Sequence, residues 1–204
     1  MHRRVVGNCS AEALLCVLLA LLAFPCCGRA MDMRVQGNTL FMGGAVVSQD
    51  CDAFDGLLKT NAIKSVVFER SPGGDVTSGY CIGSHIRAHS LSTVIQESCA
   101  SACSLMWLGG VERTLANAKS RVGMHGIGSE VGSSDGTRGG ELYVYVSGMA
   151  PKVDRKLLDQ WVHFKALTMI MIFYNDKAET CRGKGLECTP IPGRNALNVG
   201  LATK

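Results

Sequence analysis

The chain has 204 residues, of which 47% are hydrophobic, and its 21 Lys and Arg exceed its 17 Asp and Glu by a formal charge of +4. The first 30 residues hold three Arg and one Glu, so the remainder carries 18 basic and 16 acidic residues, a net charge of +2. This balance excludes the strongly basic surface of proteins that bind nucleic acid, and it gives no reason to expect an anionic membrane as partner.

The first 30 residues have the order of a secretory signal peptide. Arginines near the start precede an apolar run over 11–24, and the small residues Gly28 and Ala30 then mark a cleavage site. The run is shorter than the roughly 20 residues of a transmembrane helix. We therefore expect cleavage, which leaves residues 31–204 as a single domain in the periplasm or extracellular space, without a stable membrane anchor. An uncleaved anchor and a lipoprotein anchor at Cys26 are the alternatives.

An even number of cysteines remains after the expected cleavage, and in an exported protein this favours disulfides. They are Cys51, Cys81, Cys99, Cys103, Cys181 and Cys188. No Cys-x-x-Cys or His-x₃-His spacing supports a zinc site, so we expect no metal. Cys181 and Cys188 bracket a short stretch with two glycines and are predicted to pair. A bond between Cys99 and Cys103 is disfavoured, because two positions four apart on a helix suit a disulfide poorly; one of them would instead reach a cysteine upstream.

Strand and helix signals alternate along the first part of the domain. Alternating or β-branched apolar runs predict strands, and apolar residues at helical spacing predict helices. In chain order we expect strands at 35–40 and 45–47, a helix at 49–61, a strand at 63–68, a turn at 71–75, a helix at 76–89, a strand at 91–96, a helix at 100–108 closed by Gly109-Gly110, and a strand at 120–124. This order predicts an α/β domain with parallel strands.

The second part of the chain reads differently. Residues 126–140 are rich in Gly, Ser, Asp and Thr and predict a mobile loop. A long helix is expected over 154–174, capped by Asp154. Its second half, 167–174, is apolar on nearly every face. Such a surface is either buried in the core or packed against another subunit, and burial is the commoner outcome.

Three places have residues that can carry chemistry. The pair Gly73-Gly74 stands between a strand and a helix. Such a pair can form a tight turn without further function, bind a phosphate or stabilise an oxyanion through its backbone amides. The P-loop lysine and the third glycine of a dinucleotide fingerprint are missing, which counts against phosphate binding. Ser101 stands at another strand-to-helix junction, as a nucleophile or as a helix N-cap. Ser104, one helical turn further on, is its rival. His125 follows the strand 120–124, as a general base or as a structural histidine.

The order and spacing of these residues resemble a known family. Ser71-Pro72-Gly73-Gly74, then Ser101 within a Cys-x-Ser-Ala-Cys segment, then Arg121-Val122-Gly123-Met124-His125 are similar to the proteolytic subunit of the Clp protease, within the Clp protease/crotonase superfamily. The closing segment Ala196-Leu197-Asn198-Val199-Gly200-Leu201 is similar as well. The resemblance covers 33–125 and 194–203, and it points to an exported branch. It implies an α/β, Clp protease/crotonase-like fold of repeated β-β-α units.

The resemblance also implies roles. Ser101 would attack, His125 would take its proton, and the amides of Gly73, Gly74 and Ala102 would form the oxyanion hole. The family's third catalytic residue, an aspartate, is replaced here by Cys188. The acids nearest in sequence, Asp176 and Glu187, are therefore the candidates to orient the histidine. The two cysteines that flank Ser101 are a second departure, which would fix or block the serine.

These observations predict a serine hydrolase, a peptidase or esterase that acts on a peptide or ester substrate outside the cytoplasm and needs no cofactor. Rings and trimers are common in the resembled superfamily, so a homo-oligomer is expected, with 167–174 as the candidate interface. One alternative is a catalytically inactive binding or scaffold protein of the same fold. Another is crotonase-like chemistry on an acyl thioester, which export disfavours because coenzyme A is a cytoplasmic metabolite.

Overall fold

The computed structural model describes residues 30–127, 136–164, 168–183 and 187–204. The predicted signal peptide lies outside these residues, apart from Ala30. Within the described ranges no helix is both long enough and apolar enough to cross a membrane.

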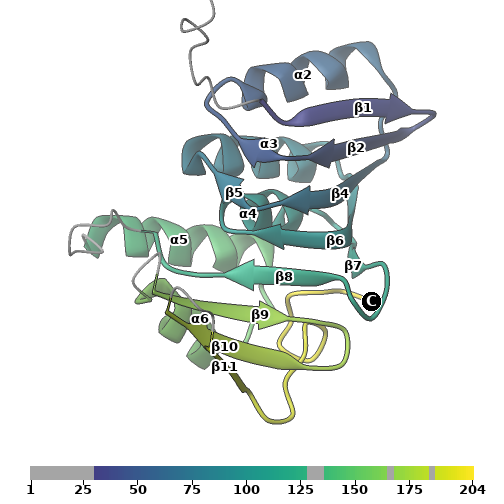
Figure 1. Ribbon diagram of the computed structural model, residues 1–204. Helices are drawn as coiled ribbons and strands as arrows, with labels where there is room; N and C mark the ends of the chain where they lie inside the picture. Colours follow the sequence, from purple (N-terminus) through teal and green to yellow (C-terminus); the bar gives the residue numbers. More distant parts are fainter. Residues whose placement is uncertain (1–29, 128–135, 165–167, 184–186) are drawn as a thin grey trace, which may run out of the picture.

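One large sheet organises the domain, and a two-stranded sheet accompanies it (Figure 1). In the described chain the large sheet has nine strands, in the order β1-β2-β4-β6-β8-β9-β10-β11, with β7 beside β6. Its strands are β1 (Asp32–Gln36), β2 (Thr39–Gly43), β4 (Ser65–Ser71), β6 (Ser92–Ala100), β7 (Arg113–Leu115), β8 (Arg121–Met124), β9 (Met169–Phe173), β10 (Ala178–Arg182) and β11 (Glu187–Pro190). The small sheet pairs β3 (Ala45–Val46) with β5 (Gly73–Gly74).

The middle of the large sheet is parallel and its two flanks are antiparallel. Strands β2, β4, β6 and β8 run in one direction, and β7 joins β6 in the same direction. β1 pairs with β2, and β9 to β11 pair in turn beyond β8, all antiparallel. The predicted α/β class is therefore correct. The finer prediction, a repeat of strand–strand–helix units, stays a prediction.

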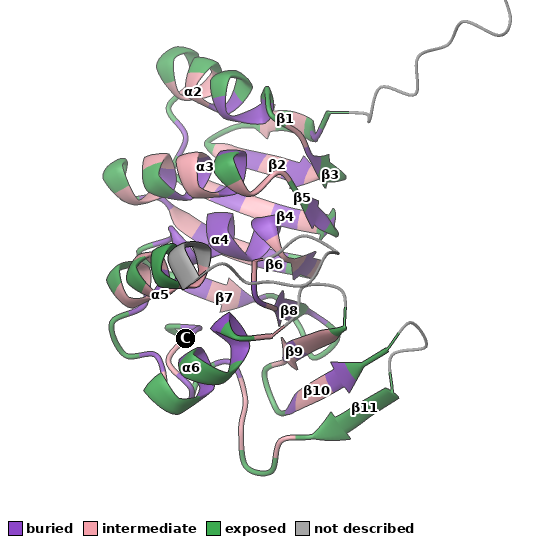
Figure 2. Cartoon of the chain, turned by 90° about the vertical axis from the view of Figure 1, so that its left-hand side faces the viewer, coloured by how far each residue is buried: buried purple, intermediate pink, exposed green. Residues whose placement is uncertain are grey.

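The helices lie together on one side of the sheet (Figure 2). In the described residues they are α2 (Asp50–Thr60), α3 (Val76–Ala88), α4 (Ala102–Leu108), α5 (Gly136–Met149) and α6 (Arg155–Val162). Burial alternates along β2 and β4, as expected for strands that are covered on one face. Side chains such as Leu40, Phe68 and Ile95 are fully buried between sheet and helices and form the core.

Local sequence explains several of these elements. α3 begins where the Asp75 carboxylate accepts a hydrogen bond from the Ser78 amide (2.7 Å), and α6 begins where Asp154 accepts from the Leu157 amide (3.2 Å). α4 ends at Leu108 with Gly109 as its C-cap, as predicted. The predicted strand at 35–40 is wrong. The chain turns at Gly37, whose φ of 60° suits a tight hairpin, so β1 and β2 lie on either side of it.

The predicted long helix at 154–174 is also wrong. α6 ends at Val162, and the apolar segment after it forms β9, which pairs with β8 on one side and β10 on the other. Met171 and Phe173 are buried, and the other three residues of β9 are half-buried. A Met-Ile-Met-Ile-Phe run has the β-branched residues that strands favour. Its apolar character reflects burial in the sheet, and its backbone is already paired on both sides.

The predicted mobile loop at 126–140 is wrong in its last part, because residues 136–140 are the first five residues of α5. Residues 128–135 lie outside the described ranges. α5 packs against α4 and α6, and its buried Leu142 and Val146 contribute to the core. Tertiary packing therefore stabilises a helix that begins in a glycine-rich sequence of low helical propensity.

Three disulfides join the cysteines of the described chain. Cys181–Cys188 has formed between β10 and β11, as predicted. The expectation for the other four cysteines was wrong, because Cys51 pairs with Cys81 and Cys99 pairs with Cys103. Cys99 lies on β6 rather than on a helix, and the turn between β6 and α4 brings the two Cα atoms to 5.2 Å. This distance is ordinary for a disulfide.

Candidate active site

Three parallel strands end side by side at one edge of the sheet. The register places Ser71 of β4 opposite Cys99 of β6, and Cys99 opposite Val122 of β8. The segments that follow these strands contain the predicted glycines, serine and histidine. The carboxyl ends of parallel strands are where α/β proteins build their sites, so the topology brings the three segments to one place.

Ser101 forms a strained turn between β6 and α4. Its φ of 56° and ψ of −128° are outside the regions that a residue with a side chain ordinarily adopts. Its amide donates to the Gly123 carbonyl of β8 (3.1 Å), which ties the turn to the next strand. Its side chain makes no capping hydrogen bond, so the N-cap interpretation is wrong. Strain of this kind costs about 1–3 kcal/mol and is concentrated at functional sites.

Close packing holds this turn in place. A Cβ atom on Gly73 would lie 2.5 Å from the Ala100 carbonyl oxygen and 2.6 Å from the Ser101 Cβ, so only glycine allows β5 to pass there. The Cys99–Cys103 disulfide links the two ends of the turn. Ser104 donates its hydroxyl to the Ser101 carbonyl (2.6 Å) and is only 2% exposed. Ser104 is thus a structural residue of the turn rather than a rival nucleophile.

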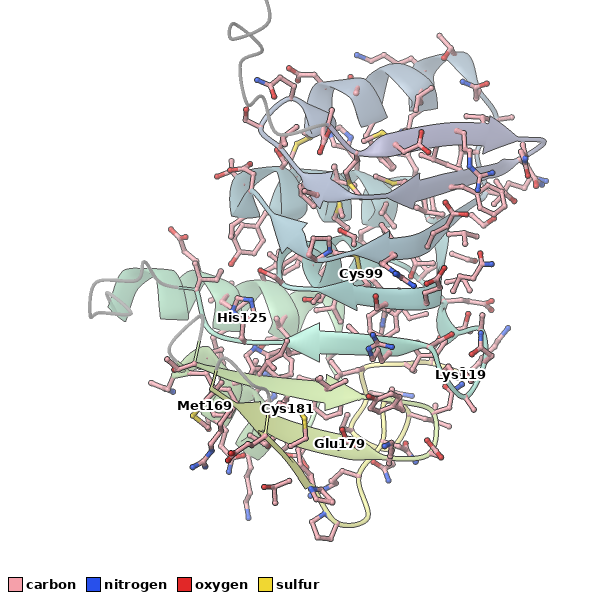
Figure 3. The ribbon with its side chains drawn as sticks, viewed as in Figure 1. Cys99, Lys119, His125, Met169, Glu179 and Cys181 are labelled. Atoms are coloured by element: carbon pink, nitrogen blue, oxygen red, sulfur yellow. A yellow bond between two sulfur atoms is a disulfide. The ribbon has the colours of Figure 1, made fainter. Side chains whose placement is uncertain are left out.

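His125 follows β8 and is half-buried; Figure 3 shows it at the end of that strand. Its Nδ1 atom is 2.7 Å from the carbonyl oxygen of Gly126. A carbonyl only accepts hydrogen bonds, so Nδ1 is the protonated donor. In the neutral ring, Nε2 is then the unprotonated nitrogen, the one that a base needs. Nothing in the sequence marked Gly126, because every residue carries a carbonyl.

Ser101 and His125 line the same cavity, which lies beneath α5 and α6. Apart from Ser101, Ser104 and His125, all its described lining residues are apolar: Val76, Ala102, Leu105, Met124, Ile127, Leu142, Val146 and Trp161. Its volume is about 10 Å³, room for about one water molecule. A substrate would therefore have to displace some of these side chains, and the apolar lining favours an uncharged group beside the reacting bond.

The predicted oxyanion donors differ in their surroundings. Ala102 lines the cavity and supplies the first amide of α4, which has no acceptor within the helix. Gly74 is exposed at the end of β5, outside the described lining. The Gly73 amide donates to the Ser71 hydroxyl (3.2 Å). Gly73 therefore makes room for the serine turn. Its amide already has an acceptor, so the structure does not support the prediction that this amide binds an oxyanion.

The two acids predicted to orient His125 lie elsewhere. Asp176 follows β9, next to Asn175, which donates to the Leu115 and Asn117 carbonyls at the opposite edge of the sheet. Glu187 lies on β11 opposite Arg182 of β10, and β11 is three strands away from β8, or about 14 Å at the usual strand spacing. Neither acid can reach the ring directly. In this structure the Gly126 carbonyl is the described partner of the His125 Nδ1 atom.

Two clusters of potential metal ligands occur in the described chain: Cys51 with Cys81 and His85, and Cys181 with Cys188 and Glu179. In both clusters the two sulfurs are joined in a disulfide. A metal ligand must be a thiolate, so neither cluster has the donors of a zinc site in this form.

No family model and no curated protein matches this sequence. A solved structure does match the fold. It is described as the 1510-N membrane-bound stomatin-specific protease, in a variant with one serine changed to alanine. The likeness has a TM-score of 0.50 at 16% sequence identity and covers 79% of this chain and 75% of that chain. At this identity the comparison shows a shared fold.

Proposed function

We propose that this protein is an exported serine hydrolase in which Ser101 is the nucleophile and His125 the general base. The observation that carries the proposal is the Ser101 turn, because a strained strand-to-helix turn presents a serine hydroxyl at a sheet edge in known serine hydrolases. The hydroxyl makes no capping bond, and the cavity that it lines is also lined by His125. The protease with a similar fold favours a peptide bond as substrate.

The chemistry follows from these groups. The Ser101 hydroxyl attacks the substrate carbonyl while His125 Nε2 takes its proton, and the oxyanion forms next to the amide of Ala102, which lines the same cavity. His125 then gives the proton to the leaving amine or alcohol, and an acyl-serine remains. Water attacks this ester, passes a proton through Nε2 to the serine oxygen, and releases the acid. The Gly126 carbonyl holds the ring in the required tautomer, although it stabilises the imidazolium less than a carboxylate does.

We also propose that the protein acts outside the cytoplasm. Three disulfides in the described chain support this, because such bonds persist in oxidising compartments. Expression in a Gram-negative host is expected to yield periplasmic protein that begins at or near Met31. Full-length protein in the cytosol would contradict export.

Labelling with a fluorophosphonate tests the catalytic assignment. We expect one adduct, at Ser101, on the protein lacking residues 1–30 and with its disulfides intact. Ser101→Ala should abolish the label, and His125→Ala should slow it by about 100-fold or more, because the base is lost. Ser104→Ala is the matched control, since it removes a neighbouring hydroxyl and should leave the adduct in place. A folded protein without any label would instead favour the scaffold function.

A further inference from the structure

A second cavity lies at the opposite edge of the sheet. It has a volume of about 490 Å³, within the range of small-molecule sites. Its walls come from α3, from β7 and the residue Val111 before it, from the end of α5 and the chain that follows, and from the C-terminal segment. Arg113 in its wall pairs with Thr93 at the start of β6, eight residues before Ser101, which is about 26 Å of extended strand. The two cavities are therefore separate.

Two arginines in this cavity share the same backbone acceptors. The Arg87 Nη2 atom donates to the carbonyls of Gly110 (3.1 Å) and Met149 (2.7 Å), and the Arg113 Nη1 atom donates to the same two oxygens at 2.9 and 3.3 Å. The Arg113 Nε atom is fixed by the Leu201 carbonyl (2.6 Å). Two guanidinium groups are thus held side by side by the ends of helices and by the C-terminal segment.

No carboxylate neutralises this pair among the described residues. The described lining of the cavity contains a third cation, the exposed Lys152, and no acid. Glu112, next to Arg113 in the chain, binds Lys204 instead (2.9 Å). Burial of Arg113, together with the nearby charge of Arg87, lowers the pKa of Arg113 to about 10. Buried charges are ordinarily paired, so a cluster of cations without a carboxylate has the chemistry of an anion site.

Both arginines have N–H groups that no described hydrogen bond uses, and apolar side chains line the same cavity. None of the described hydrogen bonds uses Nη1 of Arg87 or Nη2 of Arg113, and guanidinium forks suit carboxylate and phosphate oxygens. Within the described chain, large hydrophobic side chains are strongly exposed at Val111 (41%), Val144 (72%) and Leu197 (51%). Two of these, Val111 and Leu197, line this cavity. The site therefore offers cations and an apolar wall together.

We propose that this cavity binds a small organic anion, a carboxylate or phosphate with an apolar tail. Its charged end contacts Arg87, Arg113 and Lys152, and its tail packs on Val111 and Leu197. This site is distinct from the serine site and does not depend on it.

Calorimetric titration with hexyl phosphate and with hexanoate tests the proposal on the disulfide-bonded protein. We expect saturable binding of at least one probe, and the tighter one identifies the preferred head group; inorganic phosphate should bind more weakly because it lacks the tail. Arg113 is buried and structural, so the variants are placed at the exposed rim. Lys152→Gln and Leu197→Asn should each weaken binding about tenfold, a loss of about 1.4 kcal/mol.

Lys59→Gln is the matched control, because it removes one exposed lysine from α2, at the far end of the sheet. It should leave the affinity unchanged. The proposal is overturned if neither probe binds saturably at millimolar concentration, or if Lys152→Gln and Leu197→Asn bind as tightly as the unmodified protein. Circular dichroism of both rim variants verifies that they are folded.

Discussion

The two edges of the central sheet are built in opposite ways. At the carboxyl edge the backbone fixes the local structure: Ser101 adopts a positive φ, Gly73 makes room for it, and a disulfide links the ends of the turn. At the amino edge side chains fix the local structure, because Arg87 and Arg113 bind the carbonyls at the ends of α4 and α5. The carboxyl edge therefore presents a neutral serine hydroxyl, and the amino edge presents two positively charged guanidinium groups.

This difference indicates which substitutions each edge tolerates least. At the carboxyl edge, a residue that restricts the backbone angles should destabilise the fold, whereas at the amino edge a change of charge should alter ligand binding. α3 joins the two, because Val76 in its first turn lines the cavity of Ser101 and Arg87 lies in its last turn. Substitutions at one edge, at two of the three disulfides of the described chain and in the middle of α3 test the comparison.

The largest effect is expected at Gly73. Alanine there would place its Cβ 2.5 Å from a backbone oxygen at a φ of 89°, so Gly73→Ala should cost more than about 3 kcal/mol of unfolding free energy. Gly56→Ala is the control, because Gly56 lies within α2 with no atom within 4 Å of the new Cβ. That variant should gain up to about 1 kcal/mol. Urea denaturation measures both, and equal stability of the two variants would break the comparison.

The disulfides should separate stability from reactivity. Replacing Cys99 and Cys103 by alanine, or Cys181 and Cys188 by alanine, opens a short loop in each case, and each pair should cost about 2 kcal/mol. Only the first pair borders Ser101. We expect fluorophosphonate labelling to slow in the Cys99/Cys103 variant and to keep its rate in the other. Faster labelling after loss of Cys99–Cys103 would mean that this disulfide blocks the serine.

The smallest effect is expected in the middle of α3. The Tyr80 hydroxyl is buried and makes no hydrogen bond to the described chain, so Tyr80→Phe should be neutral or gain up to about 1 kcal/mol. Burial, with a smaller contribution from the charge of Glu141, raises the pKa of Tyr80 to about 12.

A raised tyrosine pKa sets the direction of the pH dependence. The neutral hydroxyl is favoured in the folded state, so its contribution to stability is complete below pH 10 and is lost as the pH rises towards 12. Tyr80→Phe should therefore flatten the alkaline decline between these two values in denaturation experiments. An unchanged decline would place its origin elsewhere, for example at Tyr145, whose pKa is also raised by burial.

The amino-terminal part of the fold followed from its sequence better than the rest. The helices α2 and α3 and the strands β4, β6 and β8 lie close to their expected positions, because amphipathic spacing, β-branched runs and capping residues act within a few residues. For the segment 169–173 the sequence predicts a helix, whereas the structure has the strand β9. Its apolar run fits either structure, and its partners in β8 and β10 decide between them.

For the candidate site, too, local sequence determined one part and tertiary contacts decided the other. By itself the sequence determined that glycines, a serine and a histidine each follow a strand, because residue type and local periodicity are written in the chain. Only the tertiary structure decided that Ser101 and His125 share a cavity, that the Gly126 carbonyl sets the histidine tautomer, and that Asp176 lies at the other edge. These outcomes depend on strand register and on contacts between distant residues, which no local pattern encodes.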